Sequence, residues 1–134
     1  MQTEAFLPST TDFSFKKSER LCSKKAFEFL FAKGKSTFLY PIKIIYVQEI
    51  IPDQSNVQVA FGVSKRNFKK AVDRNKLKRI LREIYRKNKI HNIPGINQYL
   101  MIIYISKDID SFNNINDILT KALKQLSGRI EKYF

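Results

Sequence analysis

The strongest constraint on the fold is a basic segment, Lys65–Lys89, that also carries a helical pattern of apolar residues. It holds twelve lysine and arginine residues against two acidic ones, a net charge of +10 out of +13 for the whole chain. Its apolar residues recur at spacings of three and four, which predicts an amphipathic helix over about Phe68–Asn88 with one side in a core. The apolar stripe comprises Leu77, Ile80, Leu81, Ile84 and Tyr85, and a second face carries Asn75, Arg79, Arg82 and Arg86.

The row of like charges on this helix indicates a polyanionic partner. A merely solvated helix usually mixes acidic and basic residues at spacings of four, and this helix does not. Crowded positive charge destabilises a fold unless a polyanion neutralises it, so nucleic acid is the favoured partner. A helix lying on a membrane surface would need a wider apolar face with aromatic anchors.

Compartment and membrane association follow from composition. The chain has one cysteine, Cys22, so it cannot form an internal disulfide, and a reducing compartment is expected. The N-terminal residues lack the basic region and long apolar run of a signal peptide. No stretch reaches the roughly 18 apolar residues of a membrane span. These features predict a cytoplasmic protein with no membrane partner.

The remaining elements predict an α+β fold, an α/β sandwich with helices packed on a mixed sheet of three or four strands. A helix is expected over Lys24–Lys33, between an N-cap at Ser23 and a C-cap at Gly34. The basic helix lies between an alternating strand and an almost continuously apolar one, which predicts a parallel βαβ unit. Strands are expected around Lys35–Phe38 and over Tyr40–Gln48, Val57–Ser64 and Gln98–Ser106, and a final helix is expected from Ile115 to Ile130, capped by Asn113 or Asn116. Residues 1–15 are expected to form a flexible N-terminal arm, and residues 16–134 a single RNA-binding domain.

Two further patterns have both a packing and a binding interpretation. Phe27 and Phe31, four residues apart and flanked by lysines, would lie on one side of the first helix. Such a pair can belong to the core or form a stacking platform for single-stranded RNA. The third strand has a face of small residues, Ala60, Gly62 and Ser64, which can lie under a helix or form a floor that a ligand approaches closely.

No constellation for catalysis by the protein itself is present in the sequence. His91 is the only histidine, and one histidine with one cysteine cannot form a zinc site. There is no glycine-rich phosphate loop. Asp108 and Asp110 are interpreted as turn residues, because a two-metal nuclease needs several convergent carboxylates. The chain is therefore predicted to bind nucleic acid, with no catalytic residue and no metal site.

The run VSKRNFKKAVDRNKLKRILREIYR, residues 63–86, resembles the signature of the bacterial ribonuclease P protein subunit. In that family a VSKK-type strand end leads into an AVxRNRxKRxxRE helix. The upstream run RLCSKKAFEFLFAKGK resembles the first helix of the family, with paired aromatic residues before a glycine. The resemblance covers about Phe15–Lys132. Lys76 stands where the family usually has arginine, which keeps the charge and loses planar bidentate contact with phosphate.

The resemblance implies a subunit of an RNA-based endoribonuclease, in which the catalytic RNA removes the 5′ leader from precursor tRNA. The protein would be non-catalytic and bind no cofactor, the required Mg²⁺ being held by the RNA, with one protein for each RNA. The family's fold places the basic helix in a left-handed βαβ crossover. The RNA-binding residues carried over or suggested by the basic stretch are Lys65, Arg66, Arg74, Asn75, Lys76, Lys78, Arg79, Arg82 and Arg86. The implied leader-binding cleft comprises Phe27, Phe31, Ile44, Tyr46, Ala60, Gly62 and Ser64.

Two other classes of function are compatible with the residues alone. One is a ribosomal or general RNA-binding protein with no role in tRNA processing, since the fold of the family resembles the second domain of a ribosomal small-subunit protein. The other is a DNA-binding factor that reads the major groove with the basic helix. A factor of that kind would need a dimer or a turn-linked pair of helices, and here the basic helix is flanked by strands.

Overall fold

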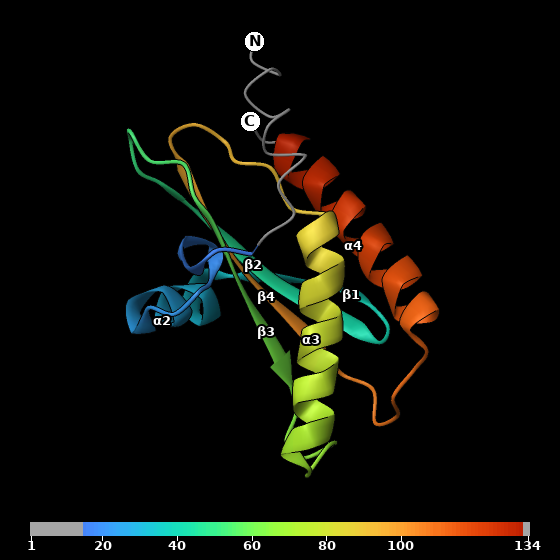
Figure 1. Ribbon diagram of the computed structural model, residues 1–134. Coiled ribbons are helices and arrows are strands. Elements are labelled where there is room, and N and C mark those ends of the chain that lie inside the picture. Colours follow the sequence, from blue (N-terminus) through green and yellow to red (C-terminus); the bar gives the residue numbers. More distant parts are fainter. Residues whose placement is uncertain (1–14, 133–134) are drawn as a thin grey trace.

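The computed structural model describes residues 15–132, with side chains to residue 128. A short 3₁₀ turn, η1, precedes an order of helix, three strands, helix, strand and helix (Figure 1). The elements are η1 (Lys17–Glu19), α2 (Lys24–Lys33), β1 (Lys35–Leu39), β2 (Ile42–Ile50), β3 (Val57–Val63), α3 (Ala71–Lys87), β4 (Ile96–Tyr104) and α4 (Phe112–Lys132). This order confirms the α+β fold predicted from the sequence.

The strands form one mixed four-stranded sheet in the order β1-β2-β4-β3. β2 pairs antiparallel with both β1 and β4, whereas β3 pairs parallel with β4. Helix α3 connects these two parallel neighbours, so the predicted βαβ unit is confirmed. The left hand implied for its crossover stays a prediction.

The core lies between one face of the sheet and the helices α3 and α4. This core face carries the fully buried side chains Ile42, Ile44, Leu100, Ile102 and Tyr104. Leu77, Leu81 and Ile84 of α3 and Ile115 and Leu119 of α4 pack against it, as their helical spacing predicts. Figure 1 shows α2 on the other side of the sheet. Because neighbouring residues of a strand point to opposite faces, Lys43, Ile45, Ala60, Gly62, Met101 and Ile103 lie on the α2 side.

Helix α2 covers only part of that second face. Phe29 packs edge-on against Tyr99 at 6.2 Å between ring centroids, and Leu30 is fully buried. At the end of the helix a Cβ on Gly34 would lie 2.2 Å from the Leu30 carbonyl oxygen and 2.9 Å from Cγ2 of Ile45. Ala60, Gly62, Met101 and Ile103 remain half-buried. We call the residues Lys43, Ile45, Ala60, Gly62, Met101 and Ile103 the open face.

The helix starts differ from expectation in two places. Helix α3 begins at Ala71 rather than Phe68, because Phe68 is buried and its ring lies 6.1 Å from that of Tyr104. Helix α4 begins at Phe112, so the predicted caps Asn113 and Asn116 are wrong. Ser111 holds that position, and its Oγ accepts a hydrogen bond from the amide of Asn114 at 3.2 Å. The bounds of α2 and its N-cap at Ser23 are confirmed.

The segment before α2 is part of the packed domain from Phe15 onward. The Phe15 ring lies 5.6 Å from that of Phe61 and 6.1 Å from that of Tyr85. The amide of Leu21 donates to the carbonyl oxygen of Val59 at 3.0 Å, so this segment covers part of the β3 edge. The expectation that Phe15 belongs to the flexible arm is therefore corrected. Residues 1–14 of the expected arm lie outside the described residues.

Candidate RNA interface

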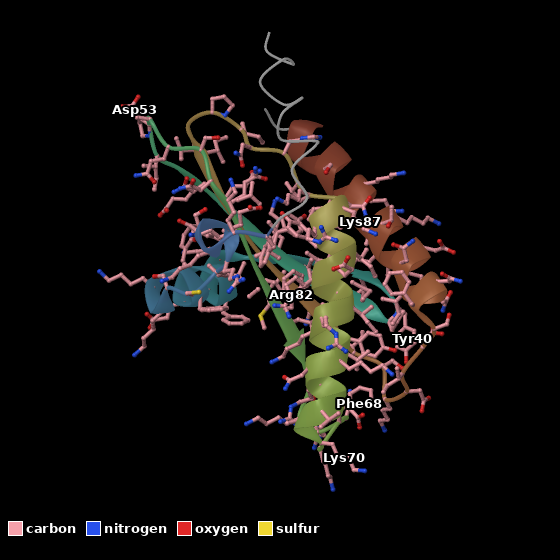
Figure 2. All side chains as sticks on the ribbon, in the orientation of Figure 1. Tyr40, Asp53, Phe68, Lys70, Arg82 and Lys87 are labelled. Atoms are coloured by element: carbon pink, nitrogen blue, oxygen red, sulfur yellow. The ribbon has the colours of Figure 1, made fainter. Side chains whose placement is uncertain are left out.

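Helix α3 presents a row of basic residues on the side opposite the core. Asn75, Lys76 and Arg79 are exposed, and Lys78, Arg82 and Arg86 are half-buried. Figure 2 shows Lys70, Arg82 and Lys87 spread along the helix from its start to its end. The turn before the helix adds exposed Lys65 and Arg66. The amphipathic pattern thus places its apolar stripe in the core and its charge on a continuous outer surface, as predicted.

Two arginines of the predicted set are engaged within the protein. Arg86 donates a hydrogen bond to the Glu83 carboxylate, and this bond lowers the pKa of Glu83 below its ordinary value. Nη1 of Arg74 donates to the carbonyl oxygens of Phe68 and Lys69 at 2.8 and 2.9 Å. Arg74 therefore fixes the turn that leads into α3. Within the described part of the chain, neither Arg79 nor Arg82 forms an ion pair with an acidic residue.

The turn between β3 and α3 is organised by its own side chains. Oγ of Ser64 accepts a hydrogen bond from the amide of Arg66 at 3.1 Å, so Ser64 shapes the turn that carries two of the predicted basic residues. The side-chain amide of Asn67 donates to the carbonyl oxygen of Ile105 at 3.3 Å, which ties the turn to the loop after β4. The basic residues at the start of α3 are thus presented on a fixed backbone.

The second candidate surface is the open face together with the adjacent side of α2. Phe27 and Phe31 stack along this side, with ring centroids 6.3 Å apart and an interplanar angle of 15°. Phe31 is 59% exposed, so the pair is not a core contact. Phe29, on the opposite side of α2, lies against Tyr99. Phe27 and Phe31 therefore lie on the side of α2 away from the Phe29–Tyr99 contact, and α2 shares its face of the sheet with Ala60 and Gly62.

The predicted leader cleft is wrong in its β2 residues. Ile44 has no exposed surface, and Tyr46 is half-buried against the same core. Both point toward α3 and α4, whereas Ala60 and Gly62 point the other way, so the predicted set cannot line one site. The β2 residues on the open face are Lys43 and Ile45. Alternation along the strand was visible in the sequence, but which set faces α2 depends on how that helix packs.

Asp108 and Asp110, interpreted from the sequence as turn residues rather than metal ligands, lie in the loop after β4. The Tyr104 hydroxyl donates to the carbonyl oxygen of Asp108 at 2.5 Å and accepts from the amide of Asp110 at 3.0 Å. The Asp110 carboxylate accepts from the amide of Ser111 at 2.8 Å. Burial raises the pKa of the Tyr104 phenol, which keeps it a proton donor. Both aspartates thus shape the start of α4.

Neither a metal-ligand cluster nor a membrane-spanning helix occurs among the described residues. Residues 15–132 contain no group of three or more histidine, cysteine, aspartate or glutamate residues able to hold a metal ion. None of the helices in this range is long and apolar enough to cross a membrane. Cys22 is exposed as a free thiol. The carbonyl oxygen of His91 accepts a hydrogen bond from Nε2 of Gln98 at 2.9 Å, so the His91 backbone anchors its loop to the sheet.

A mixed four-stranded sheet with a basic crossover helix, and with stacked phenylalanine rings on the helix at its other face, is the arrangement expected of an RNA-binding protein. A family model described as ribonuclease P matches residues 15–131. The chain belongs to the ribonuclease P protein family.

Individual relatives agree with this assignment. The ribonuclease P protein component of Porphyromonas gingivalis is 28% identical over 130 residues, which cover 92% of this chain and 94% of the relative. That of Pseudoalteromonas atlantica is 33% identical over 122 residues, which cover 89% and 95%. The solved ribonuclease P protein from Thermotoga maritima has a TM-score of 0.64 and 27% identity, and the match covers 80% of this chain and 96% of that one. The chain is thus a protein subunit of the endoribonuclease that processes tRNA, and proteins of this family act together with the ribonuclease P RNA.

Proposed function

We propose that the protein joins two RNAs through its two surfaces. Helix α3 binds the catalytic RNA of ribonuclease P, and the open face with α2 binds the single-stranded 5′ leader of precursor tRNA. The protein thereby supports endonucleolytic 5′ maturation of tRNA in the cytoplasm, with one protein for each RNA. The observation that carries this proposal is the outward row on α3, in which neither Arg79 nor Arg82 forms an ion pair with an acidic residue of the described chain.

The two surfaces differ in the kind of RNA that they suit. A row of guanidinium groups on a rigid helix matches the phosphates of a folded RNA, and contacts of this kind dominate affinity. The exposed ring of Phe31, stacked along half-buried Phe27, suits unpaired bases, since stacking accepts any base and duplex bases are not available for it. The single-stranded leader of precursor tRNA supplies such unpaired bases.

The chemistry of the reaction is assigned to the RNA. Mg²⁺ bound by the RNA would activate the attacking water, and the protein would contribute positive charge that brings two polyanions together. Its effect on single-turnover cleavage should therefore be largest at low Mg²⁺ and shrink as Mg²⁺ rises. A benefit that stays constant across the titration, or cleavage by the protein without RNA, would contradict this division of roles.

The test compares two variants of the reconstituted enzyme on precursor and mature tRNA. Arg79→Ala combined with Arg82→Ala should weaken binding to the catalytic RNA. The salt slope, which is the slope of the logarithm of the binding constant against the logarithm of salt concentration, should become shallower by roughly 0.7 to 0.9 for each phosphate that is no longer neutralised. Phe31→Ala should weaken binding of precursor tRNA and leave mature tRNA unaffected. All three residues lie outside the buried core, so circular dichroism should remain that of the wild type. Equal losses of affinity for precursor and mature tRNA would remove Phe31 from the leader site.

A further inference from the structure

The β1–β2 hairpin carries an exposed aromatic ring that the core does not use. Phe38 on β1 is 61% exposed, although β1 is an edge strand, where exposed apolar residues favour association with other chains. It pairs with Lys43 of β2 across the antiparallel ladder, so the two side chains lie on the same face of the sheet. The Lys43 ammonium lies over the ring, with Nζ 5.2 Å from the ring centroid.

This pair lies on the same face of the sheet as α2. Lys43 and Ile45 both point to the open face, and Ile45 Cγ2 lies under the C-terminal end of α2 at Gly34. The next pair along the hairpin on this face, Phe38 and Lys43, lies about 7 Å beyond the Ile45 position. Phe31 is in the last turn of α2. Phe31 and Phe38 are thus exposed rings on the same side of the sheet, at the end of α2 and just past it.

The local charge is suited to a phosphate-linked ligand. Residues 34–48 include two lysines and no acidic residue. The ammonium over one side of the Phe38 ring is attracted to its π-face and also lies where it can contact the phosphate of a stacked nucleotide. An aromatic platform with an adjacent cation is a recurring way of holding single-stranded nucleic acid without reading its sequence.

We propose that Phe38 and Lys43 form a second base-stacking subsite, separate from Phe27 and Phe31, that binds a further nucleotide of the precursor leader. The inference rests on the proposed function, since it requires a leader on the open face. A second subsite would make the affinity for precursor tRNA depend on the length of its leader. A leader that reaches only one subsite forms one stacking interaction, and a leader that reaches both forms two.

The experiment measures affinity of the reconstituted enzyme for precursors whose leaders increase by single nucleotides. Phe38→Ala should weaken binding about five- to ten-fold above a threshold leader length and have no effect below it. Phe31→Ala should show a different threshold. Phe38→Trp should keep the wild-type affinity, whereas Phe38→Leu should behave like alanine, because an aliphatic side chain offers no π-face. Lys43→Gln should weaken the same long leaders and reduce their salt dependence.

Ile50→Ala is the matched control, because Ile50 is also an exposed apolar residue, at the far end of β2 beyond the segment that pairs with β1. It should leave all affinities unchanged. A fluorescent purine placed singly along the leader should be quenched at one position by wild-type protein and by Phe38→Trp, and not by Phe38→Ala.

The outcomes separate this inference from the proposed function. If Phe31→Ala acts on precursor alone and Phe38→Ala changes nothing at any leader length, the second subsite is refuted and the leader surface stands. If Phe38→Ala weakens binding to the catalytic RNA without substrate, the residue belongs to that interface, and the inference is equally refuted. If wild-type protein does not favour precursor over mature tRNA, the proposed leader function itself fails. Concentration-dependent dimerisation that Phe38→Ala abolishes, without any leader effect, would assign the ring to an interface between copies and refute the subsite.

Discussion

Arg74 is expected to act on RNA binding through the backbone that it holds, and replacing it should therefore cost stability. Its guanidinium donates to two carbonyl oxygens of the turn before α3, at 2.8 and 2.9 Å. A hydrogen bond from a charged donor contributes about 1.5 to 3 kcal/mol when it is buried. Arg74 is half-buried and one of the two bonds is exposed, so screening by solvent reduces the sum. Arg74→Ala should lower the free energy of unfolding by roughly 1 to 3 kcal/mol.

Denaturant unfolding and salt-dependent RNA binding together test this expectation. Arg79→Ala is the matched control: it should unfold like the wild type and reduce the salt slope by about 0.7 to 0.9, as expected when one phosphate is no longer neutralised. Arg74→Lys keeps the charge and a donor nitrogen, but its ammonium lacks the fixed planar geometry of the guanidinium, so it should lose part of the same stability. An Arg74→Ala variant that unfolds like the wild type, while its salt slope falls as much as that of Arg79→Ala, would place Arg74 among the direct RNA contacts instead. Retention of full stability by Arg74→Lys would show that charge alone is sufficient.

Three further predictions concern the sheet and the helices packed on it. Gly34→Ala should lower the melting temperature in thermal unfolding, because the added Cβ would lie 2.2 Å from the Leu30 carbonyl oxygen. A wild-type melting temperature would show that the end of α2 can move to make room. Ile44→Ala should lower the free energy of unfolding in denaturant by about 2 to 5 kcal/mol, as for a fully buried residue. Ile45→Ala should lower it less and should weaken precursor binding. The reverse order would contradict the assignment of the two faces of β2. Burial raises the pKa of the Tyr85 phenol above the ordinary value of 10.0. The folded state therefore holds that proton more tightly, and stability should fall as pH rises above about 10, less steeply in Tyr85→Phe.

The sequence by itself determined the elements whose signals are local. The bounds of α2 follow from Ser23 and Gly34, and the stripe of α3 follows from the spacing of Leu77, Leu81 and Ile84. These signals succeed because capping and helical periodicity depend on residues only three or four positions apart. The motif in residues 63–86 supplied the family, and the family match over residues 15–131 confirms it.

The tertiary structure decided which residues share a surface. Alternation along β2 gives two sets of side chains, and only the packing of α2 and α3 assigns Ile44 to the core and Ile45 to the open face. The sequence likewise marks Arg74 as a basic residue of the helix motif, but its partners are carbonyl oxygens whose positions depend on Phe68 being buried against Tyr104. The proposed role of Phe38 depends on the fold in the same way, since only strand pairing places it beside Lys43. Contacts between residues distant in sequence are set by packing of the whole domain, so a local sequence pattern cannot predict them.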